Sequence, residues 1–150
     1  MNARPAPSIV VAMYRIRFVA LALAFLAEVG VDILWQGLLL RVLAGDSITP
    51  DMSDDAARQA LLAVSQLPTY TVISFLLGNA TTVGGGYLAA RLARQYPYYH
   101  GLGMGLIGIA LTLYMWQSDG LWLGLFSVLT NIPLCIWGAH LAKRHMPTPE

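Results

Sequence analysis

Four long apolar stretches alternate with short polar segments along this chain. They cover residues 18–40, 69–90, 102–116 and 121–142. A helix of about 20 apolar residues crosses the ~30 Å hydrocarbon core of a bilayer, since each residue adds about 1.5 Å. The pattern therefore predicts an all-α integral membrane protein, in which four transmembrane helices form an antiparallel bundle and residues 1–150 make a single domain. The third stretch is short for a bilayer.

The one substantial loop covers residues 44–67, between the first and second stretches. A helix can begin there at Thr49-Pro50 or at Ser53-Asp54-Asp55, where acidic residues suit the first turn. Apolar residues then recur at helical spacing until Pro68 ends the segment. We expect a short amphipathic helix that lies along the outer surface or over the mouth of the bundle. The alternative is an ordinary capped loop helix with no role in function.

The N-terminal region allows two interpretations. Residues 1–14 are expected to be a short, poorly ordered leader. The stretch that follows resembles a signal peptide, because Arg15 and Arg17 precede an apolar centre that contains small residues. Its apolar character continues to Leu40, well past the ~7–15 residues of a signal-peptide core. This length favours a membrane span.

Composition and charge agree with a membrane location. Apolar residues make up 57% of the chain and charged residues only 11%. With the N-terminus inside, seven basic residues fall on the inner side and two, Arg41 and Arg58, on the outer side. Inner loops carry the excess of Lys and Arg, and aromatic residues collect at both predicted interfaces. The sequence therefore predicts a bacterial inner (cytoplasmic) membrane protein with both termini in the cytoplasm.

Several kinds of chemistry find no support in the sequence. Cys135 is the only cysteine and lies in an apolar run, so we expect a small buried core residue rather than a disulfide or metal site. No cofactor motif, metal motif or basic nucleic-acid-binding cluster is present. His100, in an expected turn over residues 91–100, is interpreted as an interfacial residue. No nucleophile–base pair stands out, so an enzyme is a minor possibility.

A row of polar residues inside the first stretch is the candidate site. Glu28, Asp32 and Gln36 recur every four residues, so they share one helical face. A carboxylate at mid-membrane costs at least about 2.5 kcal/mol on insertion scales, so a proton, a cation or a partner group should compensate it. Two carboxylates one turn apart also repel each other when both are charged. We expect the pair to hold at least one proton, as in a proton relay or cation site.

Three polar residues of other stretches fall at a similar depth in the predicted topology. They are Asn79, Thr82 and Asn131. Such residues also hold transmembrane helices together by hydrogen bonds worth about 0.6 kcal/mol each, and for the two asparagines we favour this structural role. Pro133 follows Asn131 by two residues and predicts a kink.

Small residues predict where helices pack closely. Gly78, Thr82, Gly86 and Ala90 form one row in the second stretch, and Gly101 and Gly105 form a GxxxG pair before and within the third. The triplet Gly84-Gly85-Gly86 lacks the remaining residues of a phosphate-binding loop, so close helix packing explains it better.

Two functions fit these features. In the first, a homo-oligomer moves protons or small cations along a pathway lined by Glu28 and Asp32. In the second, the protein is an accessory or assembly subunit of a larger membrane complex, and its acidic face binds a transmembrane helix of the partner. Both require a lipid bilayer and a protein partner, and neither involves nucleic acid.

Overall fold

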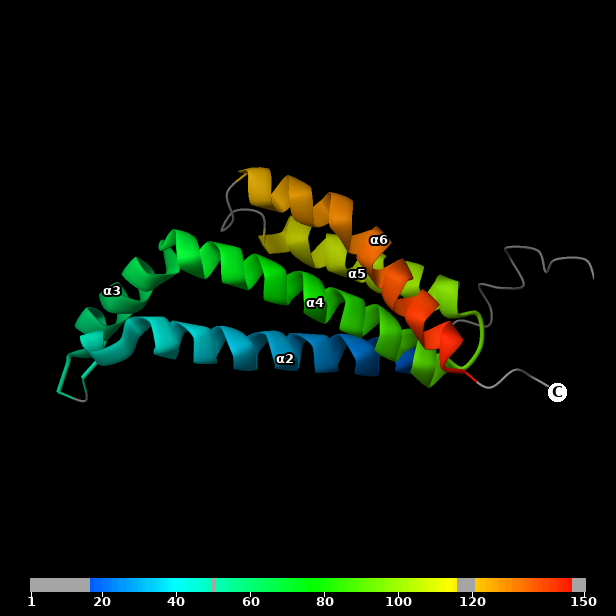
Figure 1. Cartoon of the computed structure of the whole chain (residues 1–150), viewed down its shortest axis with the longest axis horizontal. Coiled ribbons are helices and arrows are strands. Elements are labelled where there is room, and N and C mark those ends of the chain that lie inside the picture. Colours follow the sequence, from blue (N-terminus) through cyan, green and yellow to red (C-terminus); the bar gives the residue numbers. More distant parts are fainter. Residues whose placement is uncertain (1–16, 50, 116–120, 147–150) are drawn as a thin grey trace, which may run out of the picture. The chain divides into compact units, whose positions relative to one another are not determined.

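The protein is helical throughout the part that its computed structural model describes, residues 17–49, 51–115 and 121–146. Five α-helices and one short 3₁₀-helix, with no strand, make up these residues (Figure 1). They are α2 (Phe18–Ala44), η1 (Gly45–Ser47), α3 (Asp54–Ser65), α4 (Pro68–Ala93), α5 (Pro97–Met115) and α6 (Leu121–Arg144). The all-α prediction is confirmed. The predicted leader over residues 1–14 and the turn at 117–120 lie outside the described residues.

Three of the described helices are long and apolar enough to cross a membrane. They are Phe18–Ala44, Pro68–Ala93 and the described part of α6, Gly124–Arg144. These helices indicate a membrane-spanning protein. α5 is not among them, because its first turn contains two tyrosines and a histidine and its remainder includes four glycines, which lower its hydropathy. The fourth span stays a prediction.

The helices extend beyond the apolar stretches that predict them. α2 continues for about one turn past Leu40, and α5 begins at Pro97, five residues before the apolar stretch. Proline suits the first position of a helix because its missing amide proton is not needed there. The turn before α5 is therefore short, and it bends through Arg94 (φ 58°) and Tyr96 (φ 48°). For residues other than glycine, this left-handed conformation costs about 1–2 kcal/mol each.

The chain divides into two compact units, and α2 and α4 each contribute to both. The first unit comprises Met1–Glu28 and Thr82–Glu150, and the second comprises Val29–Thr81. The first unit therefore contains the N-terminal part of α2, the C-terminal part of α4, and all of α5 and α6. The second contains the remainder of α2 and α4 together with η1 and α3.

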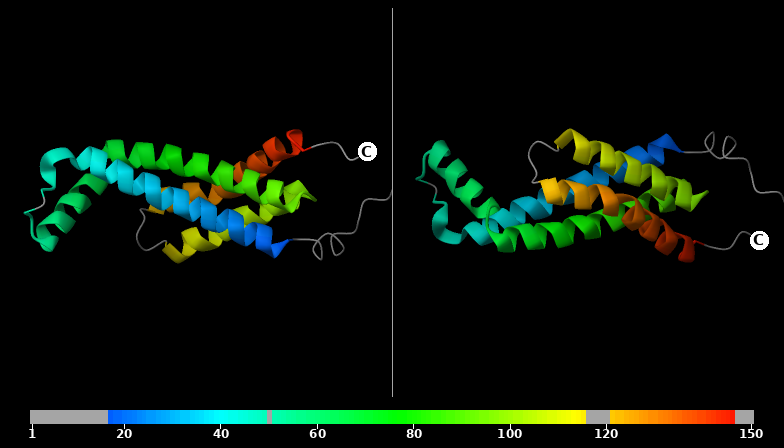
Figure 2. Two further views of the ribbon diagram at one scale, coloured as in Figure 1. Left: turned by 90° about the horizontal axis from the view of Figure 1, so that it is seen from below. Right: turned by 90° about the horizontal axis from the view of Figure 1, so that it is seen from above.

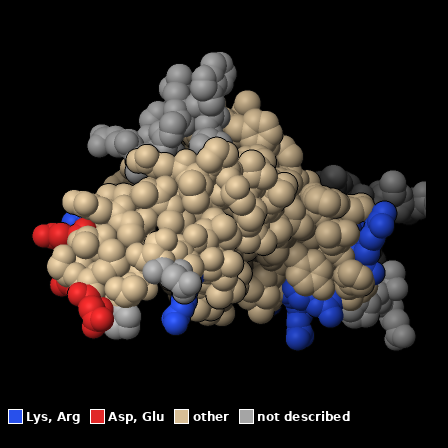
Figure 3. Space-filling model, turned by 60° about the vertical axis from the view of Figure 1, so that its left-hand side comes forward, with Lys and Arg blue, Asp and Glu red and all other residues tan. Residues whose placement is uncertain are grey.

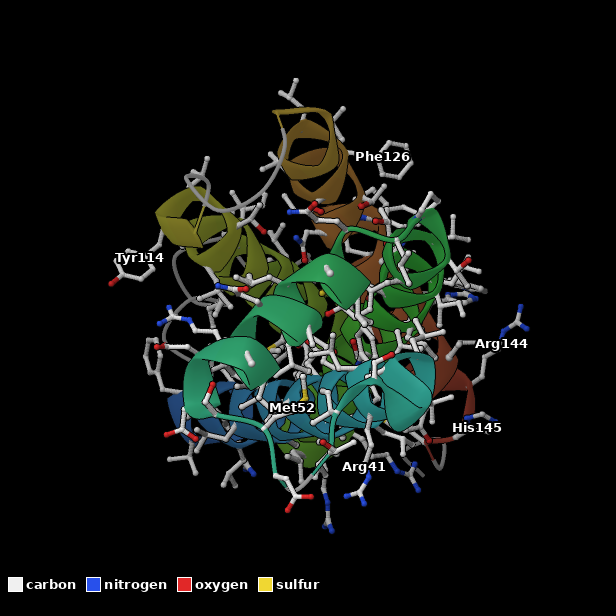
Figure 4. The ribbon with its side chains drawn as sticks, turned by 90° about the vertical axis from the view of Figure 1, so that its left-hand side faces the viewer. Arg41, Met52, Tyr114, Phe126, Arg144 and His145 are labelled. Atoms are coloured by element: carbon white, nitrogen blue, oxygen red, sulfur yellow. The ribbon has the colours of Figure 1, made fainter. Side chains whose placement is uncertain are left out.

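The core of the first unit draws one or two small or flexible side chains from each helix. Leu21 and Ala24 of α2, Ala89 of α4, Met104 of α5 and Cys135 of α6 form one buried cluster. α5 and α6 run antiparallel and pack against each other, and the α6 ribbon changes direction near its middle (Figure 2). Larger apolar side chains point outward, as Tyr114 and Phe126 do in Figure 4. This arrangement suits a bundle whose outer face contacts lipid.

Glycines allow the helices of the first unit to approach at backbone distance. A Cβ atom at Gly86 of α4 would overlap the backbone of Cys135 in α6. One at Gly101 would lie 2.8 Å from the Cys135 carbonyl oxygen, and one at Gly105 would lie 2.9 Å from Ile132 Cα. Gly78 lies in the second unit, and a Cβ atom added there would meet open space. The predicted packing glycines thus differ in their surroundings.

In the second unit, α3 is the helix that the sequence predicts for the outer loop. It begins directly after Ser53, whose Oγ accepts a hydrogen bond from the Ala56 amide at 3.4 Å. Asp54 and Asp55 occupy its first turn, where negative charge is favourable. Val64 is its buried residue, whereas Leu62 on another face remains exposed. This one-sided burial fits an amphipathic surface helix.

Candidate functional site

The six polar residues that the sequence singles out are divided between the two units. Glu28, Thr82 and Asn131 belong to the first unit, and Asp32, Gln36 and Asn79 belong to the second. The two carboxylates lie one turn apart on α2, and each has its own surroundings.

Asp32 has the most definite polar contacts of the six. Its Oδ1 atom accepts a hydrogen bond from Trp35 Nε1 at 2.8 Å and one from Thr81 Oγ1 at 2.6 Å. Trp35 lies three residues further along α2, so helix geometry brings the two side chains to the same face. Thr81 comes from α4. Asp32 is half-buried, and one of its carboxylate oxygens accepts both hydrogen bonds.

Thr81 connects Asp32 to a backbone carbonyl. Its Oγ1 lies 2.6 Å from Asp32 Oδ1 and 2.8 Å from the carbonyl oxygen of Gly78. A hydroxyl has one proton to donate and can accept as well. When Asp32 is ionised, Thr81 donates to the carboxylate. When Asp32 is protonated, it can donate to Thr81, whose own proton then turns to the Gly78 carbonyl. Both protonation states of Asp32 are satisfied without movement of a heavy atom.

Glu28 packs against α4 within the first unit. Its carboxylate occupies the space directly over Gly85 of α4, where an added Cβ would lie 2.8 Å from Glu28 Cδ. The same Cβ would lie 3.3 Å from the Met104 Cε atom of α5. Any side chain at position 85 would therefore displace the carboxylate. Gly85 is the residue that makes room for Glu28 between the helices.

The two asparagines are engaged on their own helices. Asn79 donates to the Phe75 carbonyl at 2.8 Å, and Asn131 donates to the Ser127 carbonyl at 3.0 Å. The Asn131 side chain also fills the space over Gly108 of α5, so it contributes to the contact between α5 and α6. The contact of Asn131 with α5 fits the structural role that the sequence favours, whereas the Asn79 bond stays within α4.

Thr82 and Gln36 differ in their surroundings. The Thr82 carbonyl accepts a weak hydrogen bond from Cys135 Sγ at 3.6 Å, which links α4 to α6. Gln36 is exposed on α2. Of the six predicted residues, Asp32 and Glu28 therefore have the surroundings most relevant to proton chemistry.

Sequence reasoning missed three residues that the structure makes prominent. Trp35 and Thr81 complete the Asp32 site, and the three-residue spacing from Asp32 was the available signal for Trp35. His100 is completely buried, whereas the sequence indicates an interfacial residue. Its Nε2 accepts from the Arg17 amide at 3.1 Å, and its Nδ1 lies 3.1 Å from the Tyr96 carbonyl oxygen. These partners require the neutral ring with its proton on Nδ1.

Comparisons of the chain with protein-family models, with curated proteins and with solved structures found no match. The chemistry of the site is therefore inferred from its own residues, chiefly Asp32 with Thr81 and Trp35, and Glu28 over Gly85.

Proposed function

We propose that this protein moves protons across a bacterial inner membrane as a homo-oligomer, with Asp32 and Glu28 as the groups that bind the proton. In this proposal α2, α4, α5 and α6 all cross the membrane, and both termini lie in the cytoplasm. The 19 residues of α5 come to about 28 Å at ~1.5 Å per residue, close to the thickness of the hydrocarbon core. The seven-to-two distribution of basic residues supports the orientation.

The observation that carries the proposal is the Thr81 hydroxyl between Asp32 and the Gly78 carbonyl. An intramembrane proton site must satisfy its carboxylate in both the charged and the neutral state, because an unsatisfied polar group in hydrocarbon costs several kcal/mol. Thr81 does this by reversing the direction of one hydrogen bond. Trp35 donates to the same oxygen in either state and holds the carboxylate in place.

A proton fits this geometry better than a small metal cation. Cations such as Na⁺ or Ca²⁺ need oxygen lone pairs directed at the ion. Asp32 Oδ1 instead receives an N–H and an O–H donor. A cation at that oxygen would have to displace both donors, whereas a proton needs only the hydroxyl to turn.

Glu28 supplies a second carboxylate one turn away on the same helix. It is half-buried beside Gly85 and the apolar end of Met104. A charged carboxylate at the depth of the hydrocarbon core is costly, so a carboxylate there is suited to bind a proton. The i, i+4 spacing on α2 places the two groups in succession along one face. We therefore assign proton transfer to this face of α2.

Proton flux through reconstituted liposomes tests the function. A pH-sensitive dye inside the vesicles would report proton flux after a potassium gradient and valinomycin impose a membrane potential. We expect Asp32→Asn to lower proton flux at least tenfold. Asparagine keeps the shape of the aspartate side chain, but its amide does not bind and release protons near neutral pH. Thr81→Val should also lower flux, whereas Thr81→Ser retains the hydroxyl and most of the flux. Gln36→Ala, at the exposed position on the same face, is the matched control.

Circular dichroism and size-exclusion chromatography would show that each variant still folds and assembles. Full flux in folded Asp32→Asn would overturn the assignment of Asp32. Absence of flux in the unmodified protein, under conditions in which a known protonophore collapses the gradient, would overturn the function.

A second candidate function is that of an accessory subunit in a larger membrane complex. The observation that favours it is the open space beside Gly30 and Gly37 of α2 and beside Gly78 and Gly84 of α4, where no described atom lies within 4 Å of an added Cβ. A helix of another chain could approach closely there. The oligomeric state of the protein purified alone separates the two functions. A symmetric oligomer supports proton movement, and a monomer that binds a separate membrane protein supports the subunit.

A further inference from the structure

A basic cavity lies where α4 and α6 end in the first unit. It has a volume of about 570 Å³ and is lined by Arg91, Leu92, Arg94 and Met146. None of the four lining residues is acidic. Lys and Arg side chains group near this end of the first unit in Figure 3, with no Asp or Glu visible among them. The cavity thus combines two guanidinium groups with two apolar side chains.

The fold fixes the side chain of Arg91 and the backbone of Arg94. Arg91 Nη1 donates to the His145 carbonyl at 2.5 Å, so its guanidinium joins the end of α4 to the end of α6. The His145 ring in turn packs edge-on against Tyr87, with ring centroids 6.1 Å apart. Arg94 follows α4 directly, in the left-handed conformation that turns the chain toward α5. A ligand would therefore meet one arginine, Arg91, whose guanidinium is already held, and a second, Arg94, whose backbone is already arranged.

The chemistry of these four residues fits one class of ligand. Guanidinium groups match phosphate oxygens through paired, charge-assisted hydrogen bonds, and one anion between two arginines also relieves their mutual repulsion. Leu92 and Met146 offer contact to hydrocarbon beside that charge. α4 is one of the three helices suited to cross a membrane, so its end lies where lipid headgroups are expected.

We propose that this cavity binds the phosphate of an anionic membrane lipid, with the first part of the lipid tail against Leu92 and Met146. Arg91 and Arg94 contact the phosphate. The site is separate from Asp32 and does not depend on proton transport. A free phosphate ion is also an anion with phosphate oxygens, but it lacks the tail. Contact with the apolar half of the cavity therefore distinguishes the lipid from free phosphate.

Lipid binding to the delipidated protein in neutral detergent tests the proposal. Native mass spectrometry would count bound dioleoyl-phosphatidylglycerol against dioleoyl-phosphatidylcholine, which has the same tails and no net charge. We expect phosphatidylglycerol to bind at least fivefold more tightly. Arg94→Asn should weaken it about fivefold or more, and asparagine tolerates the left-handed conformation at this position. Leu92→Gln should weaken the binding of phosphatidylglycerol, because it removes an apolar contact with the lipid tail. It should leave the binding of inorganic phosphate unchanged.

Arg144→Gln is the matched control for charge. Arg144 lies at the end of α6, does not line the cavity, and points away from the ribbon in Figure 4. It should change phosphatidylglycerol binding less than twofold. Equal losses in Arg94→Asn and Arg144→Gln would overturn the site in favour of diffuse attraction. Equal binding of the two lipids, or displacement of phosphatidylglycerol by millimolar inorganic phosphate, would also overturn it.

Discussion

The two carboxylates of α2 show how one residue type acquires different properties from its neighbours. Asp32 has two hydrogen-bond donors on a single oxygen, and one of them, Thr81, can reverse its role. Glu28 depends instead on the absence of a side chain at Gly85, which leaves space for the carboxylate. A mutation on α4 can therefore disturb either carboxylate without changing α2.

Gly85→Ala should destabilise the protein because its methyl group would occupy the position of the Glu28 carboxylate. Overpacking of this kind costs about 1–3 kcal/mol, which would lower the thermal midpoint measured in detergent. Gly84→Ala is the control, since no described atom lies within 4 Å of a Cβ there. Combining Gly85→Ala with Glu28→Ala should recover part of the loss. If the two alanine substitutions have equal effects, Gly85 is not what positions Glu28.

His100 is expected to be neutral, with its proton on Nδ1. Nitrogen NMR of the labelled ring would distinguish this tautomer from the Nε2–H form and from the charged ring. Replacing His100 by Phe would leave the Arg17 amide and the Tyr96 carbonyl without these bonds, at a cost of about 1–3 kcal/mol. His140→Phe, which removes a contact with the exposed Tyr98 hydroxyl, should cost less. A charged His100 ring in the folded protein would contradict this account.

At the scale of the helices, one row of small residues has two different environments. Gly86 and Ala90 of α4 are buried in the first unit, and Gly86 meets the backbone of Cys135. Gly78 belongs to the second unit and has open space. Gly138 of α6 completes the close contact from the opposite side, because a Cβ there would lie 2.7 Å from the Tyr87 amide nitrogen. The α4–α6 contact therefore relies on glycine from both helices.

Gly86→Leu and Gly78→Leu form a matched pair on the same helix. Leucine at position 86 would force α4 and α6 apart, so the folded bundle should be lost or its thermal midpoint in detergent should fall steeply. Leucine at position 78 should be tolerated within about 1 kcal/mol, since leucine also has the better helix propensity. Similar tolerance at both positions would show that α4 and α6 do not meet through Gly86.

At the scale of the whole molecule, the proposed topology decides which end of each span faces which compartment. This topology is proposed from the basic residues near the helix ends, such as Arg91 in the last turn of α4 and Arg94 just after it, against Arg41 in the last turn of α2. Moving a positive charge outward across the membrane is unfavourable during insertion, so the side with more Lys and Arg stays inside.

Cysteine labelling in intact cells tests the topology, after the buried Cys135 is replaced by Ala. A cysteine at the exposed Ser53 should react with an impermeant maleimide added outside. One at the exposed Gln95, in the turn between α4 and α5, should react only after the membrane is permeabilised. The reverse pattern would place both termini outside and would contradict the proposed topology.

The sequence by itself determined the local and periodic features of the protein. Long apolar runs predict helices because each turn of a membrane helix satisfies its own backbone, whatever its neighbours are. Because a cap involves residues within one turn, the sequence indicates two possible starts for the loop helix, Thr49-Pro50 and Ser53-Asp54-Asp55, and the structure has the second. The shared face of Glu28 and Asp32 follows from helix geometry alone.

The tertiary structure decided which side chains meet. The contact of Thr81 with Asp32 and the space over Gly85 for Glu28 join residues about 50 positions apart, and they depend on how each helix is rotated about its axis. In a chain this apolar, nearly every face of a helix is hydrophobic, so periodicity does not indicate the rotation. For the same reason, the sequence does not predict that His100 is buried. Its burial depends on packing against residues from distant parts of the chain, such as Arg17.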